Sequence, residues 1–428
     1  MSGAPHDTRS GKSTFTTQRY AGFAKGMNNI LADVELPADQ LRNAVNVDVL
    51  DSGKLRRRAG KTQIASGRAH SLWSNGSLAL VFHAGALKQI NPSLSLTTLA
   101  DNLADRPISY TEAGLDVYWS NGSDYGRISG GANQPWGVEV PTVAPALVAS
   151  SGGALPAGSY QGAVTFVTAT GEESAASNVG ATDVTAGTLT ITVPQPTEPQ
   201  VTGIRLYLTA PNGELFCAIV EVAVGVLTYA VVGLPVYGRE LKTQFMARMI
   251  PCDIIAHWRG HIFGASGNTL WHTEPYAFGL MRPAANYHQF PTDIRLVVPV
   301  TTGIYVVCDK TYWMGHQSHV TGGMGVQTVG VHEVAPYSAA LRSSCSIPDS
   351  PDMMWFTDRG LVLARENGKL ELLQIDNVFP GAYNNGAVFI REKDSIRQVV
   401  ASVQNPHTGS ELAAQDWMEA EIVRSARS

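Results

Sequence analysis

Residues 43–60 alternate between apolar and polar positions and then turn back on themselves. Valines at 45, 47 and 49 are separated by polar residues, which is the period-two pattern of a strand with one buried face. Asp51-Ser52-Gly53 follows with the chemistry of a tight turn, in which Gly53 is free to adopt positive φ. Residues 54–58 then form a short basic strand that ends at Gly60. The pattern predicts a β-hairpin.

Similar groups of three or four short strands recur along the chain, each roughly 30 to 40 residues long. Glycine, asparagine and proline separate the strands, and many strands end near a tryptophan or tyrosine. Because such a small sheet cannot bury both faces alone, neighbouring units must stack, which favours a degenerate β-propeller. An irregular β-sandwich with chance similarity between units is the alternative. The strands of the five units lie within residues 69–99, 107–128, 254–271, 294–314 and 343–373, and connecting segments make up the rest of each unit.

Residues 141–232 break this rhythm. The segment has few charges, is rich in threonine, valine, alanine and glycine, and is punctuated by the prolines at 141, 145, 194, 196 and 199. About seven short strands fit into its ~90 residues, which is the number in an immunoglobulin or fibronectin type III-like sandwich. Surface loops tolerate insertions of this kind. The sequence therefore predicts a β-sandwich inserted between two propeller blades.

The two ends of the chain differ from the rest. Residues 1–18 are polar and predict a flexible arm, or one that orders only on assembly. Near the other end, Ser410 is a suitable N-cap for a C-terminal helix. Leu412, Trp417 and Ile422 would lie on its apolar face and are candidates for docking to another protein or to the chain's own domain.

These patterns divide an all-β chain into five parts. We expect an N-terminal arm, a first propeller part, an inserted sandwich, a second propeller part and a helical tail. The corresponding ranges are 1–18, 19–140, 141–235, 236–405 and 406–428.

Composition narrows the classes of function. The 428 residues include 36 acidic and 31 basic side chains, giving a net charge of −5. A domain that binds nucleic acid tightly is usually basic, so the balance argues against tight DNA binding. It is compatible with lining a passage through which DNA slides.

The sequence predicts neither a membrane span nor a secretory signal. No run of about 18 apolar residues is present, and the N-terminus lacks an apolar core segment. Cys217, Cys252, Cys308 and Cys345 are widely separated, so we expect buried free thiols and no zinc site or disulfide framework.

No catalytic, metal or cofactor site is predicted. Ser10-Gly11-Lys12-Ser13-Thr14 lacks the earlier glycine and the preceding strand of a phosphate-binding loop. His257 and His261 have a spacing that suits zinc only on a helix, and here a turn separates them. The pair Glu172-Glu173 is expected to be solvated surface charge.

One dense basic patch remains, formed by Lys54, Arg56, Arg57 and Arg58. We interpret it as a candidate for subunit docking or contact with DNA phosphates. The alternative is an exposed edge strand whose charge prevents aggregation.

The N-terminal segment resembles tail proteins of tailed bacteriophages, namely the nozzle or tail-tube hub proteins of short-tailed phages. The resemblance is carried by Gly26-Met-Asn-Asn, Leu36-Pro, Asn43-Ala-Val-Asn-Val-Asp and Gly53-Lys-Leu-Arg-Arg-Arg-Ala-Gly60. The family more often has proline where this chain has Ala59. A second cluster is similar to the fibronectin-like insert of such proteins and comprises Leu155-Pro-Ala-Gly-Ser-Tyr, Gly171-Glu-Glu-Ser and Ile204-Arg-Leu-Tyr.

The resemblance implies a structural virion protein and transfers no active-site residue. Proteins of this family form rings, typically hexamers, around a channel for genome ejection. The implied partners are other copies of the chain, portal or adaptor proteins, tail fibres and passing double-stranded DNA without sequence-specific binding. The implied location is the virion tail, after assembly in the host cytoplasm.

Two alternatives remain open at this point. In the first, the chain is a tail protein that binds a host receptor or glycan, with Trp73, Trp119, Trp258 or Trp313 stacking on sugars. In the second, it is a propeller-type glycoside hydrolase, which requires two carboxylates to converge in a channel.

Overall fold

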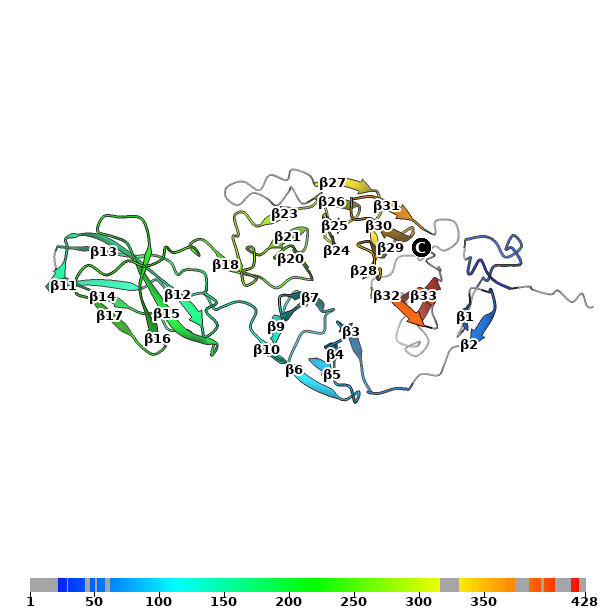
Figure 1. Cartoon of the computed structure of the whole chain (residues 1–428), viewed down its shortest axis with the longest axis horizontal. Helices are drawn as coiled ribbons and strands as arrows, with labels where there is room; N and C mark the ends of the chain where they lie inside the picture. Colours follow the sequence, from blue (N-terminus) through cyan, green and yellow to red (C-terminus); the bar gives the residue numbers. More distant parts are fainter. Residues whose placement is uncertain are drawn as a thin grey trace, which may run out of the picture.

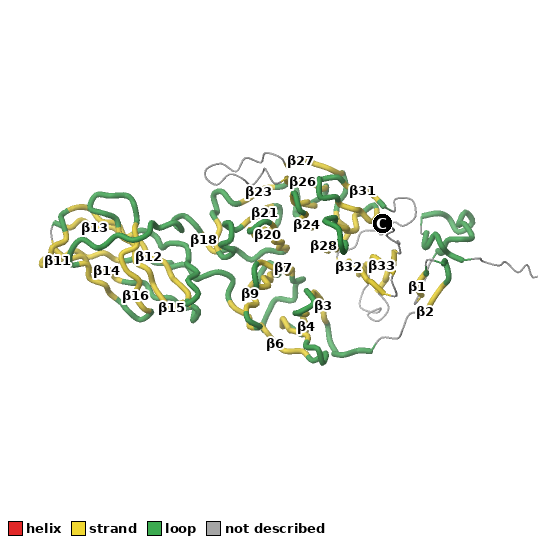
Figure 2. The backbone as a smooth tube through the Cα atoms, viewed as in Figure 1, coloured by secondary structure: helices red, strands yellow, loops and turns green. Residues whose placement is uncertain are grey.

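The computed structural model describes residues 22–28, 30–42, 47–50, 52–57, 62–185, 187–315, 331–373, 385–393, 396–404 and 417–422. Within these ranges every regular element is a strand and no helix occurs (Figure 2). The prediction of an all-β protein is confirmed.

Six antiparallel sheets follow one another around an arc (Figure 1). The first sheet contains β3 (Ala69–Ser74), β4 (Ala79–His83), β5 (Ala86–Ile90) and β6 (Leu96–Ala100). The second contains β7 (Ser109–Ala113), β8 (Asp116–Ser120), β9 (Tyr125–Ser129) and β10 (Ala132–Gln134). The third contains β19 (Ile254–Trp258), β20 (His261–Ser266), β21 (Thr269–His272) and β23 (Tyr287–Gln289).

The remaining three sheets complete the series. The fourth contains β24 (Leu296–Val300), β25 (Gly303–Val307), β26 (Thr311–Gly315) and β27 (Val331–Ala335). The fifth contains β28 (Ala339–Ser346), β29 (Met353–Thr357), β30 (Gly360–Ala364) and β31 (Leu370–Leu372). The sixth contains β32 (Asn385–Lys393), β33 (Ile396–Gln404) and β34 (Trp417–Ile422).

Consecutive sheets pack face to face, as propeller blades do. The first strand of a sheet contacts the first strand of the next, in the pairs β7–β19, β19–β24, β24–β28 and β28–β32. Buried apolar clusters lie between successive sheets; Trp119, for example, lies between the first and second sheets, and Trp355 between the fourth and fifth. Because each sheet buries its faces only against its neighbours, the chain forms a degenerate β-propeller, as the repeats predict.

Serine hydroxyls bridge some of the neighbouring sheets. The backbone N–H of Ile255 donates to Ser109 Oγ at 3.0 Å, and Ser109 Oγ donates to the carbonyl of the same residue at 3.3 Å. Ser343 bridges to Val388 in the same way, at 3.0 and 3.5 Å. Each hydroxyl thus gives a hydrogen-bond partner to one backbone N–H and one backbone carbonyl of the neighbouring sheet.

A two-sheet sandwich is inserted between β10 and β19 and lies at one end of the molecule (Figure 1). One sheet has the order β11-β14-β17, from β11 (Ala146–Leu155), β14 (Gly187–Thr192) and β17 (Thr228–Val231). The other has the order β13-β12-β15-β16, from β12 (Gly158–Thr168), β13 (Gly180–Val184), β15 (Val201–Leu208) and β16 (Cys217–Ala223). Their inner faces bury a shared core that includes Phe166, Leu189 and Ile204, which confirms the predicted sandwich.

Two small sheets complete the fold. The hairpin of β1 (Val47–Val49) and β2 (Leu55–Arg57) is confirmed and forms a sheet of its own. The other sheet pairs β18 (Ala247–Arg248), which returns from the sandwich, with β22 (Leu280–Met281).

The prediction of a C-terminal helix is wrong for residues 417–422, the part of the tail that the structure describes. Residues 417–422 form β34, which pairs antiparallel with β33. Their sequence, Trp-Met-Glu-Ala-Glu-Ile, also suits a strand, and pairing with β33 overrides local helix preference. Trp417 and Ile422 therefore occupy the two ends of a strand, and Leu412 lies outside the described residues. Docking through these residues stays a prediction.

Candidate functional site

The hairpin turn of the predicted basic site is held by backbone geometry. Gly53 has φ of +74°, and a Cβ there would lie 2.8 Å from the backbone nitrogen of Ala24. The N–H of Phe23 donates to the Gly53 carbonyl at 2.7 Å. Only glycine fits this close approach without strain, so the expected positive φ of Gly53 is confirmed.

The buried side chain of Asn28 fixes the loop before the hairpin through hydrogen bonds. Asn28 is buried, and its Nδ2 donates to Gln40 Oε1 at 2.9 Å. Its Oδ1 accepts hydrogen bonds from the N–H groups of Ile30 at 3.0 Å and Leu31 at 3.1 Å. Asn28 thereby joins the two ends of the loop, which gives a structural role to one residue of the segment that carries the family resemblance.

The buried position of β1 differs from the one that the valine pattern predicts. Asp48 is only 5% exposed, whereas Val47 and Val49 are half-buried. A carboxylate oxygen of Asp48 lies 3.4 Å from a guanidinium nitrogen of Arg391 on β32. This ion pair attaches the hairpin to the sixth sheet and explains why a charged residue is buried there.

The structure places two of the four basic candidates, Arg56 and Arg57, on β2, and Lys54 directly precedes that strand. Arg56 lies directly across from Asp48 and is half-buried. Lys54 and Arg57 are exposed, and Arg57 lies across from Val47. Arg58 lies outside the described residues. The side of the hairpin opposite Asp48 therefore combines half-buried Val47 and Val49 with exposed Arg57, a composition that suits a protein contact.

An arginine that the sequence analysis missed joins the sandwich to the propeller. Arg248 on β18 donates through Nε to the Trp136 carbonyl at 2.7 Å and through Nη1 to Glu198 Oε1 at 2.6 Å. Its guanidinium also lies 5.7 Å from the ring centroid of Tyr125. The sequence does contain a sign of this contact, because Arg248 is the single charge in the apolar run from Phe245 to Ile250. A charge in such a run needs a partner when it is buried.

The expectation that Glu172 and Glu173 are solvated surface charges is wrong. Glu172 pairs with Arg127 of β9 at 3.1 Å, which forms a second contact between sandwich and propeller. The Glu173 side chain is only 13% exposed and pairs with Arg205 at 2.8 Å. It also accepts a hydrogen bond from the Tyr207 hydroxyl at 2.6 Å. Both glutamates are therefore structural ion-pair partners.

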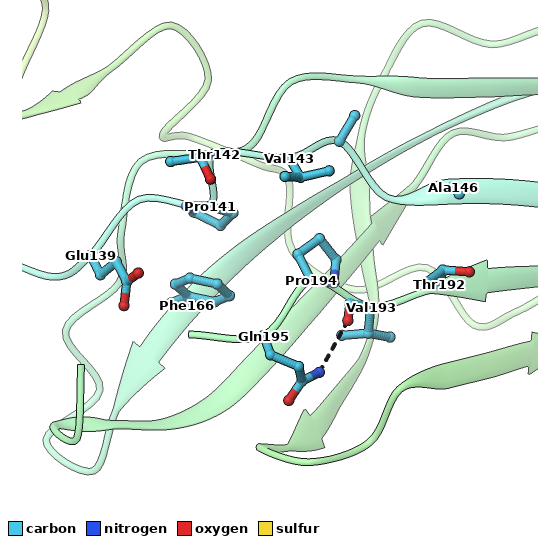
Figure 3. Close-up of a pocket in the computed structure, with 11 residues that line it drawn as sticks. Glu139, Pro141, Thr142, Val143, Ala146, Phe166, Thr192, Val193, Pro194 and Gln195 are labelled. Atoms are coloured by element: carbon cyan, nitrogen blue, oxygen red, sulfur yellow. Dashed lines mark hydrogen bonds between the residues drawn. The ribbon is translucent and has the colours of Figure 1, made fainter. Parts of the chain in front are cut away.

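A cavity of about 290 Å³ opens at the base of the sandwich (Figure 3). Its lining is mainly apolar, with Phe166, Pro141, Val143 and Pro194 around the opening. At its edge, Glu139 accepts hydrogen bonds from the N–H groups of Thr197 at 2.7 Å and Glu198 at 2.8 Å. Burial alone would raise the pKa of Glu139, but these hydrogen bonds outweigh burial and lower the pKa. Glu139 thus stays ionised and orders the loop.

The thiols and imidazoles are mostly buried. All four cysteines are free, as predicted, and burial raises the pKa of Cys252, Cys308 and Cys345 to about 12. Such thiols are poor nucleophiles. Among the described residues no group of three or more His, Cys, Asp or Glu is arranged to hold a metal ion, and no helix there is suited to crossing a membrane.

The tryptophans considered for sugar stacking lie mainly in the blade cores. Trp119, Trp258 and Trp313 are 2%, 6% and 7% exposed. Trp73 is half-buried and its ring packs 5.7 Å from that of Tyr110. Buried rings cannot present a face to a sugar.

Comparisons with known proteins do not identify a family. No family model matches the chain, and no curated protein matches it. Among solved structures, the extracellular domain of the one-component system BT4673 from B. thetaiotaomicron has 10% identity and a TM-score of 0.28, over 78% of this chain and 37% of that chain. The chain thus spans well under half of that domain.

Two further solved structures show the same low level of similarity. Virginiamycin B lyase from Staphylococcus aureus has 11% identity and a TM-score of 0.28, over 78% of this chain and 91% of that chain. A chain of the mitotic checkpoint complex has 9% identity and a TM-score of 0.30, over 81% of this chain and 92% of that chain. Similarity this low carries no argument about function.

Proposed function

We propose that this protein is a structural subunit of a bacteriophage tail, of the nozzle or hub kind, that assembles into a ring around the tail axis. The observation that carries the proposal is the N-terminal hairpin, whose sequence resembles that family. Asp48 attaches it to the sixth sheet, while Lys54 and Arg57 are exposed. An element with one docked side and one exposed basic side is suited to joining neighbouring subunits.

The arrangement of the molecule also supports this proposal. The sandwich lies at one end and the hairpin lies at the opposite end, with the propeller between them (Figure 1). In a ring, such a subunit has separate surfaces for its neighbours and for attached proteins such as an adaptor or fibres. The proposed channel conducts DNA without binding it tightly, which agrees with the net charge of −5.

The alternative functions have less support. A glycan-binding role through the tryptophans is disfavoured because three of them are buried. A glycoside hydrolase needs a carboxylic acid with a raised pKa. Glu139 has a lowered pKa, and Glu173 pairs with Arg205. We propose no cleavage of glycosidic bonds.

The proposal is tested by the assembly state. We expect purified protein to form closed rings in negative-stain electron microscopy, and we expect the same rings on the tail axis of particles that contain it. Protein that stays monomeric at all concentrations and is absent from particles would contradict the proposal.

A variant tests the basic strand directly. Replacing Lys54, Arg56, Arg57 and Arg58 with serine removes the positive charge and is expected to reduce ring assembly at least about tenfold, because docking loses its ionic contacts. The thermal unfolding midpoint should change little, because Lys54 and Arg57 are exposed and buried Asp48 keeps its ion pair with Arg391 when Arg56 is replaced. The matched control replaces four basic residues of the propeller, Lys88, Arg106, Arg259 and Lys310, with serine. Equal assembly of the two variants would refute the assignment.

A further inference from the structure

Three side chains beside the first sheet form a continuous hydrogen-bond chain. Ser71 Oγ on β3 lies 2.8 Å from His70 Nδ1, and His70 Nε2 lies 2.9 Å from Asp105 Oδ1, in the segment between β6 and β7. One tautomer of the imidazole, assigned from these contacts, satisfies both: Nε2–H donates to the carboxylate, and Nδ1 accepts the hydroxyl proton. A nucleophile, a base and a group that orients the base thus stand in the order of a catalytic triad.

Neighbouring side chains hold the base and its carboxylate in place. The His70 ring stacks on Phe82, with ring centroids 4.2 Å apart and an interplanar angle of 16°. Phe82 is 2% exposed, so the core fixes its own position. A guanidinium nitrogen of Arg68 lies 2.9 Å from the second carboxylate oxygen of Asp105. Rotation of the imidazole would break both the stacking and the contact with Asp105, which preorganises the chain.

The backbone of the nucleophile is strained. Ser71 has φ of +54°, a value that side chains other than glycine rarely adopt. It lies in a bulge of β3, where Ser71 and Leu72 together stand opposite Val81 of β4. Strained residues and β-bulges both concentrate at functional sites, where they set the direction of a side chain. The strain thus coincides with the residue that the hydrogen-bond chain marks as a nucleophile.

A structural role alone does not explain this arrangement. Ser109, Ser120 and Ser343 also bridge neighbouring sheets, and their printed partners are backbone groups. Ser71 makes a bridge of the same kind, because its Oγ accepts the N–H of Ile108 at 2.8 Å. It adds a histidine and a carboxylate, which a bridge does not need. The accepted N–H also leaves the hydroxyl proton of Ser71 for His70.

The site is open to solvent and has a donor for developing negative charge. The side chains of His70 and Asp105 are 22% and 49% exposed, and Leu72 is 71% exposed. A carbonyl carbon bound to Ser71 Oγ would bring its oxygen close to the N–H of Ile108, which can stabilise an oxyanion. Exposed Leu72 beside the nucleophile offers apolar surface to a short acyl chain.

We propose that Ser71, His70 and Asp105 form an esterase site for short-chain carboxylic esters. Ser71 Oγ attacks the ester carbonyl carbon, and its proton passes to His70 Nδ1. The intermediate collapses as the bond to the alcohol oxygen breaks, and the alcohol leaves with the proton from His70. Water then attacks the acyl-serine and gives a proton to His70. That proton returns to Ser71 Oγ as the carboxylic acid leaves.

The geometry favours an ester over an amide. A single backbone N–H gives modest support to the oxyanion, so the leaving group has to depart readily, as an alcohol or phenol does. The open site contacts the acyl group and little else, so selectivity among alcohols is expected to be low. The activity goes beyond the proposed structural role and does not depend on ring formation.

Hydrolysis of p-nitrophenyl acetate by the full-length protein tests the site. Wild-type protein should release p-nitrophenol faster than buffer, and Ser71→Ala should lower kcat/KM at least about tenfold. Ser343→Ala, which removes a bridge of the same kind without a histidine, should keep the wild-type value. Wild-type protein without activity above buffer, or equal kcat/KM in the wild-type and Ser71→Ala proteins, would overturn the proposal.

Covalent labelling identifies the nucleophile independently of turnover and of folding of a variant. Diisopropyl fluorophosphate should add one diisopropylphosphoryl group to wild-type protein as fluoride leaves, and peptide mass spectrometry should locate it on Ser71. Absence of a label on Ser71 would overturn the assignment.

Asp105 is assigned as a positioning residue, because it acts through His70. Asp105→Asn should lower kcat with little change in KM, since it disturbs the imidazole tautomer and leaves substrate binding intact. Asp105→Glu, which keeps the carboxylate, should recover part of the loss. The thermal unfolding midpoint should stay close to the wild-type value in both variants, because the Arg68–Asp105 pair is exposed. An unchanged kcat in Asp105→Asn would overturn this role.

Discussion

At the scale of single residues, the charges with the clearest roles are the ones that pair across elements. Asp48, Glu173 and Arg248 each contact a charged residue of another strand or loop. A buried charge is tolerated only when its partner is close and well oriented. Each of these ion pairs therefore fixes where one part of the chain contacts another part.

Buried histidines give the protein a predicted sensitivity to acid. His272 on β21 and His288 on β23 have ring centroids 5.8 Å apart, and burial lowers the pKa of each to about 4 from the ordinary 6.5. Between these pH values the folded protein binds fewer protons than the unfolded chain. The contribution of the two neutral histidines to the free energy of unfolding is therefore fully present above about pH 6.5. It is lost as the pH drops toward 4, by roughly 2–3 kcal/mol for His288.

The measurement is urea unfolding of wild-type and His288→Leu proteins between pH 7 and pH 4. The loss of unfolding free energy over this range should be smaller in the variant, because one proton-binding group is gone. Substitution of the buried Phe290 by leucine removes no titratable group, so it is the control and should leave the slope unchanged. Identical slopes in the wild-type and His288→Leu proteins would show that His288 does not contribute.

At the scale of elements, hydroxyl groups connect blades that share no ladder. Ser120 at the end of β8 is fully buried. Its Oγ donates to the Cys252 carbonyl at 2.7 Å and accepts from the Cys252 N–H at 2.9 Å. The same geometry recurs at Ser109 and Ser343. Serine suits this position because one small group both donates and accepts.

We predict that Ser120→Ala lowers the free energy of unfolding by about 1–3 kcal/mol, because it leaves a buried N–H and carbonyl without partners. The control is Ser77→Ala at an exposed turn, which should change stability by less than about 0.5 kcal/mol. Equal stability of the two variants, measured by chemical unfolding, would contradict the proposed bridge.

At the scale of the whole molecule, two ion pairs fix the orientation of the sandwich relative to the propeller. Arg248 contacts Glu198, and Arg127 contacts Glu172, so the sandwich is held at two points as it leaves the propeller. Short linkers alone would allow relative motion of the two parts. The paired contacts make the sandwich a fixed extension of the propeller.

Arg248→Met should release one of these points while keeping much of the side-chain volume. We expect broader sandwich positions in electron-microscopy class averages and a larger radius of gyration in small-angle scattering, with Glu198 left unpaired. Arg282→Met removes the exposed Arg282–Glu274 contact near β22 and serves as the control. Unchanged sandwich positions in Arg248→Met would show that Arg127 and the linkers are sufficient.

The sequence by itself determined the all-β class, the recurrent blades, the sandwich and the turn at Gly53. Period-two alternation and turn residues are local properties, so they can be read without knowing what packs where. The same local reading failed at residues 417–422, where pairing with β33 decides that the chain is a strand. It also placed Glu172 and Glu173 in solvent, because their arginine partners come from other strands.

Only the tertiary structure decided which polar residues are buried and which surfaces are left exposed. Asp48 is buried because folding brings Arg391 beside it, and Glu173 is largely buried because folding brings Arg205 and Tyr207 beside it. Both features depend on pairs of residues that are distant in sequence. A local pattern can specify a strand and its two sides, but the partner that covers each side is fixed only when the strands meet.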